Sequence, residues 1–182
     1  KRATLTRRSR ARSLFLEPLD RRVLLAVDFG DAPDTGAGTG PGNYNTLSTD
    51  NGPSHTIVAG LFMGASVDGD SGTLQNAAAN ADDVNQALPD DEDGLNNPAA
   101  DLTLTVGAAP TVNVIVTNTT GSTATLSGWI DTNNNGVFDV TERAQAAVPN
   151  GTSGGIVTLT FPTVPSGFTG KTYARFRLST DG

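Results

Sequence analysis

The sequence predicts an all-β protein, an antiparallel β-sandwich of jelly-roll-like type with long acidic loops. From position 101 onward, apolar and mostly β-branched residues alternate with polar ones in short segments, a pattern typical of strands with one buried face. Turn-forming residues separate these segments, and the chain contains 21 Gly and 10 Pro. Many short strands joined by tight turns are typical of a sandwich.

Five segments show this alternation. DLTLTVGA, TVNVIVTNTT, TATLSGWID, GGIVTLTFP and TYARFRLST follow one another along the chain. They predict strands at 102–106, 111–117, 123–130, 155–161 and 172–178. Six large aromatic side chains are expected to fill the core between the sheets: Trp129, Phe138, Phe161, Phe168, Tyr173 and Phe176.

The first hundred residues give weaker signals. Residues 57–67, IVAGLFMGASV, can supply one or two short buried strands, and residues 74–88 contain enough Ala and Gln for a short helix. The segments around them are rich in Gly, Asp, Asn and Pro, which predicts loops and turns.

Charge is unevenly distributed. Residues 1–22 carry eight Lys or Arg and two acids, a net charge of +6, whereas the other 160 residues carry four and seventeen, a net charge of −13. An acidic body repels the phosphate backbone, which argues against nucleic-acid binding, and it attracts cations. Charged residues interrupt the apolar run in residues 1–27, so we interpret this part as a disordered, basic targeting leader that does not span a membrane.

The strongest candidate site is DTNNNGVFDVTE, residues 131–142. Oxygen-bearing residues at its first, third, fifth, ninth and twelfth positions, with Gly at the sixth, match the spacing of an EF-hand calcium loop. Because LSGWI before it is predicted to be a strand, the loop is expected between β-strands, where nothing requires the chain to return Glu142 to the ion. The predicted calcium ligands are Asp131, Asn133, Asn135, Val137 through its carbonyl, Asp139 and Glu142. The alternative is a hairpin loop whose Asn and Asp side chains cap their own backbone.

A second acidic cluster lies upstream, at Asp68, Asp70, Asp82, Asp83, Asp90, Asp91, Glu92 and Asp93. Bunched carboxylates either stay solvated or share a cation. PDDEDG is compact enough to supply two or three oxygens, and DFGDAPD (28–34) can add more from a distance in sequence. The candidate ligands of a second cation site are Asp90, Asp91, Asp93 and Asp31.

Enzymatic chemistry finds little support in the sequence. The chain has no Cys and a single His, His55, whose neighbour Ser54 is too close in sequence to pair with it for catalysis. The acids lie in Gly- and Asp-rich turns without the surrounding aromatic residues that bind sugar or raise a carboxyl pKa. A calcium-dependent carbohydrate-binding module is the alternative function, with Trp129, Tyr44 and Tyr173 as stacking platforms. The sequence disfavours it, because Trp129 is expected to be buried.

Two stretches of the chain resemble known families. LEPLDRRVLLA (16–26) is similar to the LEPR-XLL motif of large exported proteins of planctomycetes and related bacteria, which implies that residues 1–27 are an address tag. DFGDAPD, LFMGASVDGD, DDEDG, GWIDTNNNGVFD and ARFRLST occur in the order of the GEVED domain. This resemblance covers residues 28–182 and implies a domain that continues past Gly182 to a Gly-Glu-Val-Glu-Asp motif.

The GEVED resemblance also implies a function. Such domains are accessory, calcium-associated modules of large secreted and surface proteins, with no known catalysis. We therefore expect a structural or adhesion module, secreted or on the bacterial cell surface. Its expected cofactor is Ca²⁺, and its expected partner is a cell-surface protein or a glycan.

Overall fold

The computed structural model describes residues 26–81, 94–101 and 103–181, and within them the chain is all-β with antiparallel sheets. The short strands β1 (Val27–Phe29) and β2 (Ser54–Thr56) pair with each other. Strand β3 (Leu61–Met63) follows, then a single helical turn, α2 (Pro98–Asp101). The remaining strands are β4 (Thr111–Asn118), β5 (Ala124–Ile130), β6 (Arg143–Val148), β7 (Thr152–Thr160) and β8 (Ala174–Ser179). Single 3₁₀ turns, η1 (Ser48–Asp50) and η2 (Val140–Glu142), complete the described elements.

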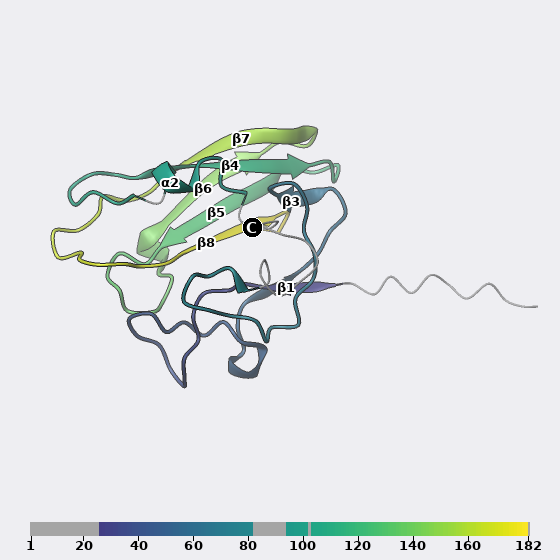
Figure 1. Cartoon of the computed structure of the whole chain (residues 1–182). Coiled ribbons are helices and arrows are strands. Elements are labelled where there is room, and N and C mark those ends of the chain that lie inside the picture. Colours follow the sequence, from purple (N-terminus) through teal and green to yellow (C-terminus); the bar gives the residue numbers. More distant parts are fainter. Residues whose placement is uncertain (1–25, 82–93, 102, 182) are drawn as a thin grey trace, which may run out of the picture.

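Two three-stranded sheets form the sandwich, with strand orders β3-β4-β7 and β6-β5-β8 (Figure 1). The loop-rich segment that carries β1 lies at one side of this sandwich, next to β8. The predicted antiparallel β-sandwich is therefore confirmed. The predicted disordered leader lies outside the described residues, except for its last two positions.

Alternation fixes which side of each strand faces the core. In β4, Val112, Val114 and Val116 are buried, and in β5 the even-numbered residues point inward. Gly128 is one of these inward positions, and a Cβ there would lie 2.8 Å from both Leu159 Cδ1 and Phe161 Cζ. The missing side chain thus lets the two sheets approach closely.

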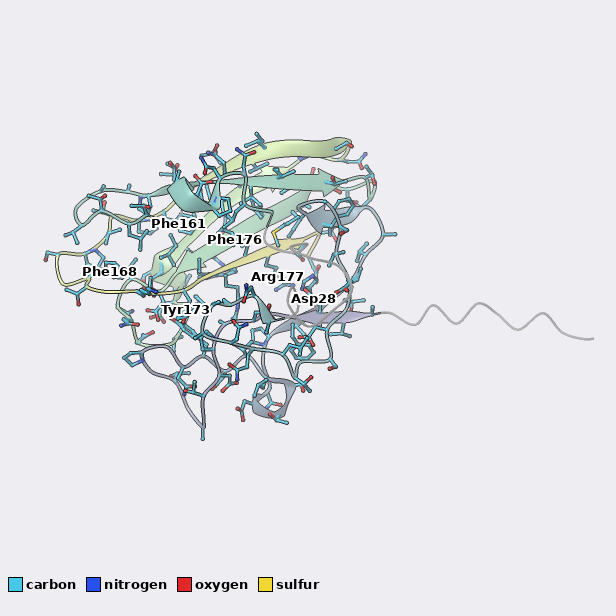
Figure 2. All side chains as sticks on the ribbon, viewed as in Figure 1. Asp28, Phe161, Phe168, Tyr173, Phe176 and Arg177 are labelled. Atoms are coloured by element: carbon cyan, nitrogen blue, oxygen red, sulfur yellow. The ribbon has the colours of Figure 1, made fainter. Side chains whose placement is uncertain are left out.

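Only some of the aromatic residues predicted for the core lie in it. Phe161 is buried between the sheets and Phe176 packs against the core (Figure 2). Trp129 is only half-buried, because it occupies an odd-numbered position of β5 and therefore faces outward, paired with Arg143 and Arg175. The core itself is mainly aliphatic.

Four predicted strands are confirmed with boundaries shifted by a few residues, and the fifth, predicted at 102–106, is wrong for the residues that the structure describes. Residues 103–106 form no strand. The Thr103 N–H donates to the Ala100 carbonyl at 3.3 Å, and the Thr105 carbonyl accepts a hydrogen bond from the Ala108 N–H at 3.0 Å, so local turns take up these backbone groups. The short helix predicted within residues 74–88 does not include 74–80, where the Asn76 side chain accepts hydrogen bonds from the backbone N–H groups of Ala78 and Asn80. Ala81 is helical. The rest of that predicted helix, 82–88, lies outside the described residues.

Strand β6 is not among the strands predicted from the sequence. Its residues, RAQAAV, alternate between buried and more exposed positions and pair with Ala124 to Trp129 of β5. Ala has low strand propensity, so this segment gives little β-signal on its own. Its place in the sheet follows from its pairing with β5.

Candidate metal centre

The candidate calcium loop connects two paired strands. Residues 131–142 lie between the end of β5 and the start of β6, and Trp129 and Arg143 face each other across the hairpin. The EF-hand-like spacing therefore occurs in a β-hairpin connection, as the preceding strand predicted. The loop's buried start and its more exposed middle have different surroundings.

Asp131 is the buried anchor of the loop, with 0% of its surface exposed. Its Oδ2 accepts hydrogen bonds from the Tyr44 hydroxyl at 2.8 Å and the Gly136 N–H at 2.9 Å, and its Oδ1 accepts one from the Asn135 N–H at 3.1 Å. Its backbone is held as well, because the Thr172 hydroxyl donates to its carbonyl oxygen. One carboxylate thus ties the loop to a residue 87 positions earlier.

Three of the predicted ligands converge at the exposed side of the loop. The side-chain amides of Asn133 and Asn135 donate to the same oxygen, Asp139 Oδ2, at 3.1 and 3.0 Å. The Asn135 Oδ1 accepts a hydrogen bond from the Val137 N–H at 2.8 Å. Positions three, five and nine of the loop are therefore brought to one point. The carboxylate and amide groups there are of the type that calcium prefers.

Glu142 is buried and turned back onto the loop. Its Oε1 accepts hydrogen bonds from the Thr132 N–H at 2.8 Å and the Asn133 N–H at 3.1 Å, and its Oε2 accepts one from the Asp139 N–H at 3.2 Å. A single side chain thereby holds both the start and the end of the loop. The alternative interpretation of the loop predicted capping by Asn and Asp side chains, whereas here a Glu side chain caps the backbone.

Aromatic rings pack Tyr44, from the segment between β1 and β2, against the loop. Tyr44, 1% exposed, stacks on Phe138 with ring centroids 4.9 Å apart and meets the Tyr173 ring edge-on at 5.4 Å. The Arg175 guanidinium lies 4.5 Å from the centre of the Phe138 ring. Figure 2 labels Tyr173, which directly precedes β8. Because Tyr44 is enclosed, it is unavailable as a sugar-stacking platform.

Burial also sets the protonation of this cluster. Burial, together with the adjacent Asp131 carboxylate, raises the pKa of Tyr44, so its hydroxyl stays a hydrogen-bond donor at neutral pH. Burial lowers the pKa of Arg175 to about 10, which leaves the guanidinium charged under physiological conditions. Sequence reasoning missed this cluster, since Tyr44 and Asp131 are joined only by the tertiary fold.

The other predicted cation ligands are placed only in part. Asp31 is half-buried, and its backbone carbonyl accepts a hydrogen bond from the Asn76 N–H at 3.3 Å. Asp90, Asp91 and Asp93 lie outside the described residues. Within the part of the chain that the structure describes, no three His, Cys, Asp or Glu side chains form a metal-binding group. A cation site among these residues must therefore also use amide, hydroxyl or carbonyl oxygens.

His55 lies in β2 opposite Asp28 of the paired strand β1, with Nε2 3.6 Å from Asp28 Oδ2. Both line a small cavity of ≈ 20 Å³ that extends to Leu178. This volume suits about one water molecule, whereas organic ligands need several hundred Å³. His55 is therefore better explained as a structural residue than as part of a substrate site.

The stability of the chain is expected to fall at mildly acidic pH in part through His55. Burial, and secondarily Arg177, lowers the pKa of His55 in the folded state. Its neutral form thus contributes stability above the unfolded pKa of about 6.5, and that contribution is lost as the pH falls below it. Urea unfolding at pH 8 and at pH 5.5 should show a smaller loss for His55→Gln than for the wild type. An equal loss in both would contradict this assignment.

In the comparisons with known proteins, one family model matches part of this chain. Residues 125–182 match the model of the GEVED domain, a non-catalytic module of secreted bacterial proteins. The matched span begins in β5 and includes the whole candidate calcium loop. The comparisons give no support to an LEPR-XLL motif, and residues 16–25 lie outside the described part. No curated protein and no solved structure shows significant similarity to the chain.

Among the described residues, no helix has the length and apolar character needed to cross a bilayer. GEVED domains occur in exported proteins.

Proposed function

We propose that the chain is a non-catalytic structural module of an exported bacterial surface protein, stabilised by a calcium ion in loop 131–142. The match of residues 125–182 to the GEVED domain supports the module. The convergence of Asn133, Asn135 and Asp139 on one point supports the ion. In this proposal the ion orders the hairpin loop between β5 and β6, in a chain that contains no Cys for disulfides.

The convergent amides can become ligands through a local change. Turning each amide about its Cβ–Cγ bond exchanges its Nδ2 and Oδ1, so that an oxygen replaces each donor now directed at Asp139. For Asn135 the change removes the 2.8 Å hydrogen bond from the Val137 N–H. The backbone path stays the same, and calcium accepts the irregular geometry that such a loop offers.

Asp131 and Val137 complete the proposed ligand set. Each carboxylate oxygen has two lone pairs, and Asp131 Oδ1 uses one for the Asn135 N–H, so the other is available. Val137 offers its carbonyl at the seventh position, as in an EF-hand loop. With Asp131 and Asp139 as the charged ligands, the site has two negative charges, which match a divalent cation.

Glu142 takes a different role in this proposal. Its two oxygens already accept hydrogen bonds from the Thr132, Asn133 and Asp139 N–H groups. Releasing a buried carboxylate from these donors would leave several N–H groups without an acceptor, at about 1–3 kcal/mol each. We therefore propose Glu142 as the clamp that preforms the loop, with water in place of its oxygens around the ion.

Calcium is expected to raise the melting temperature of the full chain. At a calcium concentration 100-fold above Kd the stabilisation is about 2.7 kcal/mol, equivalent to about 5–10 °C for a chain of this size. Asp139→Ala should remove the share that comes from the loop. Differential scanning calorimetry in EDTA and in calcium measures both, with magnesium as the comparison ion.

A matched variant separates ligand loss from general damage to the loop. Thr141 is exposed and lies between the proposed ligand Asp139 and the clamp Glu142. Thr141→Ala should keep the full calcium shift. An Asp139→Ala chain with the same calcium shift as the wild type would show that the loop binds no calcium.

A further inference from the structure

A second pair of acids, Asp68 and Asp70, lies away from loop 131–142 in the segment that follows β3. Residues 66–71 form neither a helix nor a turn. Gly69 alone separates the two residues, so both carboxylates belong to one short stretch of the chain. Asp70 is 4% exposed and Asp68 is half-buried. The pair is therefore enclosed rather than solvated.

Each of these carboxylates has a buried oxygen that no donor satisfies. Asp70 Oδ1 accepts a hydrogen bond from the Gly72 N–H at 2.8 Å. Within the described part of the chain, Asp70 Oδ2 and Asp68 Oδ1 are buried and have no hydrogen-bond partner. Buried polar atoms are nearly always paired, and an unpaired charged one is costly. The two oxygens indicate that a further group belongs beside them.

No basic side chain of this segment can be that group. Residues 26–81 contain no Lys or Arg. Among the described residues, the contact of His55 with Asp28 includes neither Asp68 nor Asp70, and no Lys or Arg forms an ion pair with either. Two like charges two residues apart also repel each other, and burial strengthens the repulsion. An external cation would neutralise both.

The acidic pair is held in place by two other stretches of the chain. A Cβ at Gly69 would lie 2.9 Å from Ala26 Cβ, and one at Gly72 would lie 2.7 Å from Ser48 Cβ. The Ser48 N–H and hydroxyl both donate to the Gly72 carbonyl, at 2.8 and 3.0 Å. The segment 68–72 is therefore packed beside the start of β1 and beside η1, and an ion there would stabilise that junction.

We propose that Asp68 and Asp70 bind a hard divalent cation of the calcium class at a second site, separate from loop 131–142. The two carboxylates supply the charged oxygens and balance its charge, and waters and backbone carbonyls complete a shell of six to eight oxygens. This site lies outside the span that matches the GEVED domain, 125–182. It does not depend on the function proposed for the loop.

Calorimetric titration of the full chain with calcium tests the second site. The wild type should bind one ion more than Asp68→Asn/Asp70→Asn, whatever the loop does. Asp139→Ala should remove a different ion and leave the Asp68–Asp70 ion in place. If the loop binds no calcium but this proposal holds, the double variant alone abolishes binding. Unchanged calcium stoichiometry and affinity in the double variant would overturn the proposal.

The melting temperature in EDTA distinguishes loss of calcium binding from general unfolding of the double variant. Asn at position 70 keeps an acceptor for the Gly72 N–H and removes a buried charge, so the double variant should melt at or above the wild-type temperature in EDTA. Its calcium-dependent gain should be smaller. Asp50→Asn, in the same segment, is the control and should bind calcium like the wild type. If the double variant fails to fold, Asp68→Asn alone should weaken the affinity of this site about tenfold or more, and unchanged affinity would overturn the proposal.

Discussion

Replacing Asp131 by Ala is expected to lower the free energy of unfolding by about 4 kcal/mol, because at least two buried donors lose a charged acceptor at about 2 kcal/mol each. These donors are the Tyr44 hydroxyl and the Gly136 N–H. The effect should persist in EDTA, since it comes from the protein's own hydrogen bonds. Urea unfolding in EDTA measures it directly.

Two variants make this prediction specific. Asp131→Asn keeps the shape and one acceptor oxygen but removes the charge, so its loss should lie between those of the wild type and Asp131→Ala. Asp139→Ala removes an acceptor at the exposed side of the same loop and should cost less than about 1 kcal/mol in EDTA. If Asp131→Ala unfolds like Asp139→Ala, Asp131 is not the anchor of the loop.

Gly136→Ala is expected to have the second-largest effect, a loss of about 3 kcal/mol or more. Gly136 has φ +77°, which costs a residue with a Cβ about 1–2 kcal/mol. The added Cβ would also lie 2.3 Å from the Asn43 carbonyl oxygen and 2.4 Å from the backbone of Gly40. Backbone atoms cannot move aside as a flexible side chain can, so the loop and the segment near residue 40 must separate.

Gly107→Ala provides the matched control. Gly107 has a similar φ of +81°, but nothing lies within 4 Å of a Cβ placed there. It should therefore lose only the backbone term, about 1–2 kcal/mol. The difference between the two variants, measured by urea unfolding, is the cost of the close approach. Equal losses would mean that residues 40–43 do not pack on the loop.

Local pattern predicted most of the sandwich. Strands β4 and β5 were predictable because they are eight and seven residues long and alternate apolar with polar side chains. Strand β6 was not, since Ala144 and Ala146 carry little β-signal and depend on β5 for their conformation. Residues 103–106 show the opposite case, in which the sequence alternates but local turns take up the backbone groups of Thr103 and Thr105.

The candidate site likewise has features that the sequence predicts and features that depend on the tertiary fold. Its spacing predicted the loop, its ligand types and its position after a strand. The partners of Asp131 could not be predicted, because Tyr44 lies 87 residues away and reaches Asp131 only through the fold. Likewise, composition revealed the acids at positions 68 and 70, but not that two of their oxygens are buried without a donor.

The side-chain amides of Asn133 and Asn135 offer the most direct test of the proposed calcium loop. Both now donate to Asp139 Oδ2, and both must turn to present oxygen to an ion. In ¹H–¹⁵N NMR spectra of the full chain, their two NH₂ signals should shift together as calcium is added, following one binding isotherm. If both signals stay unchanged at a calcium concentration that saturates the chain, loop 131–142 does not hold the ion.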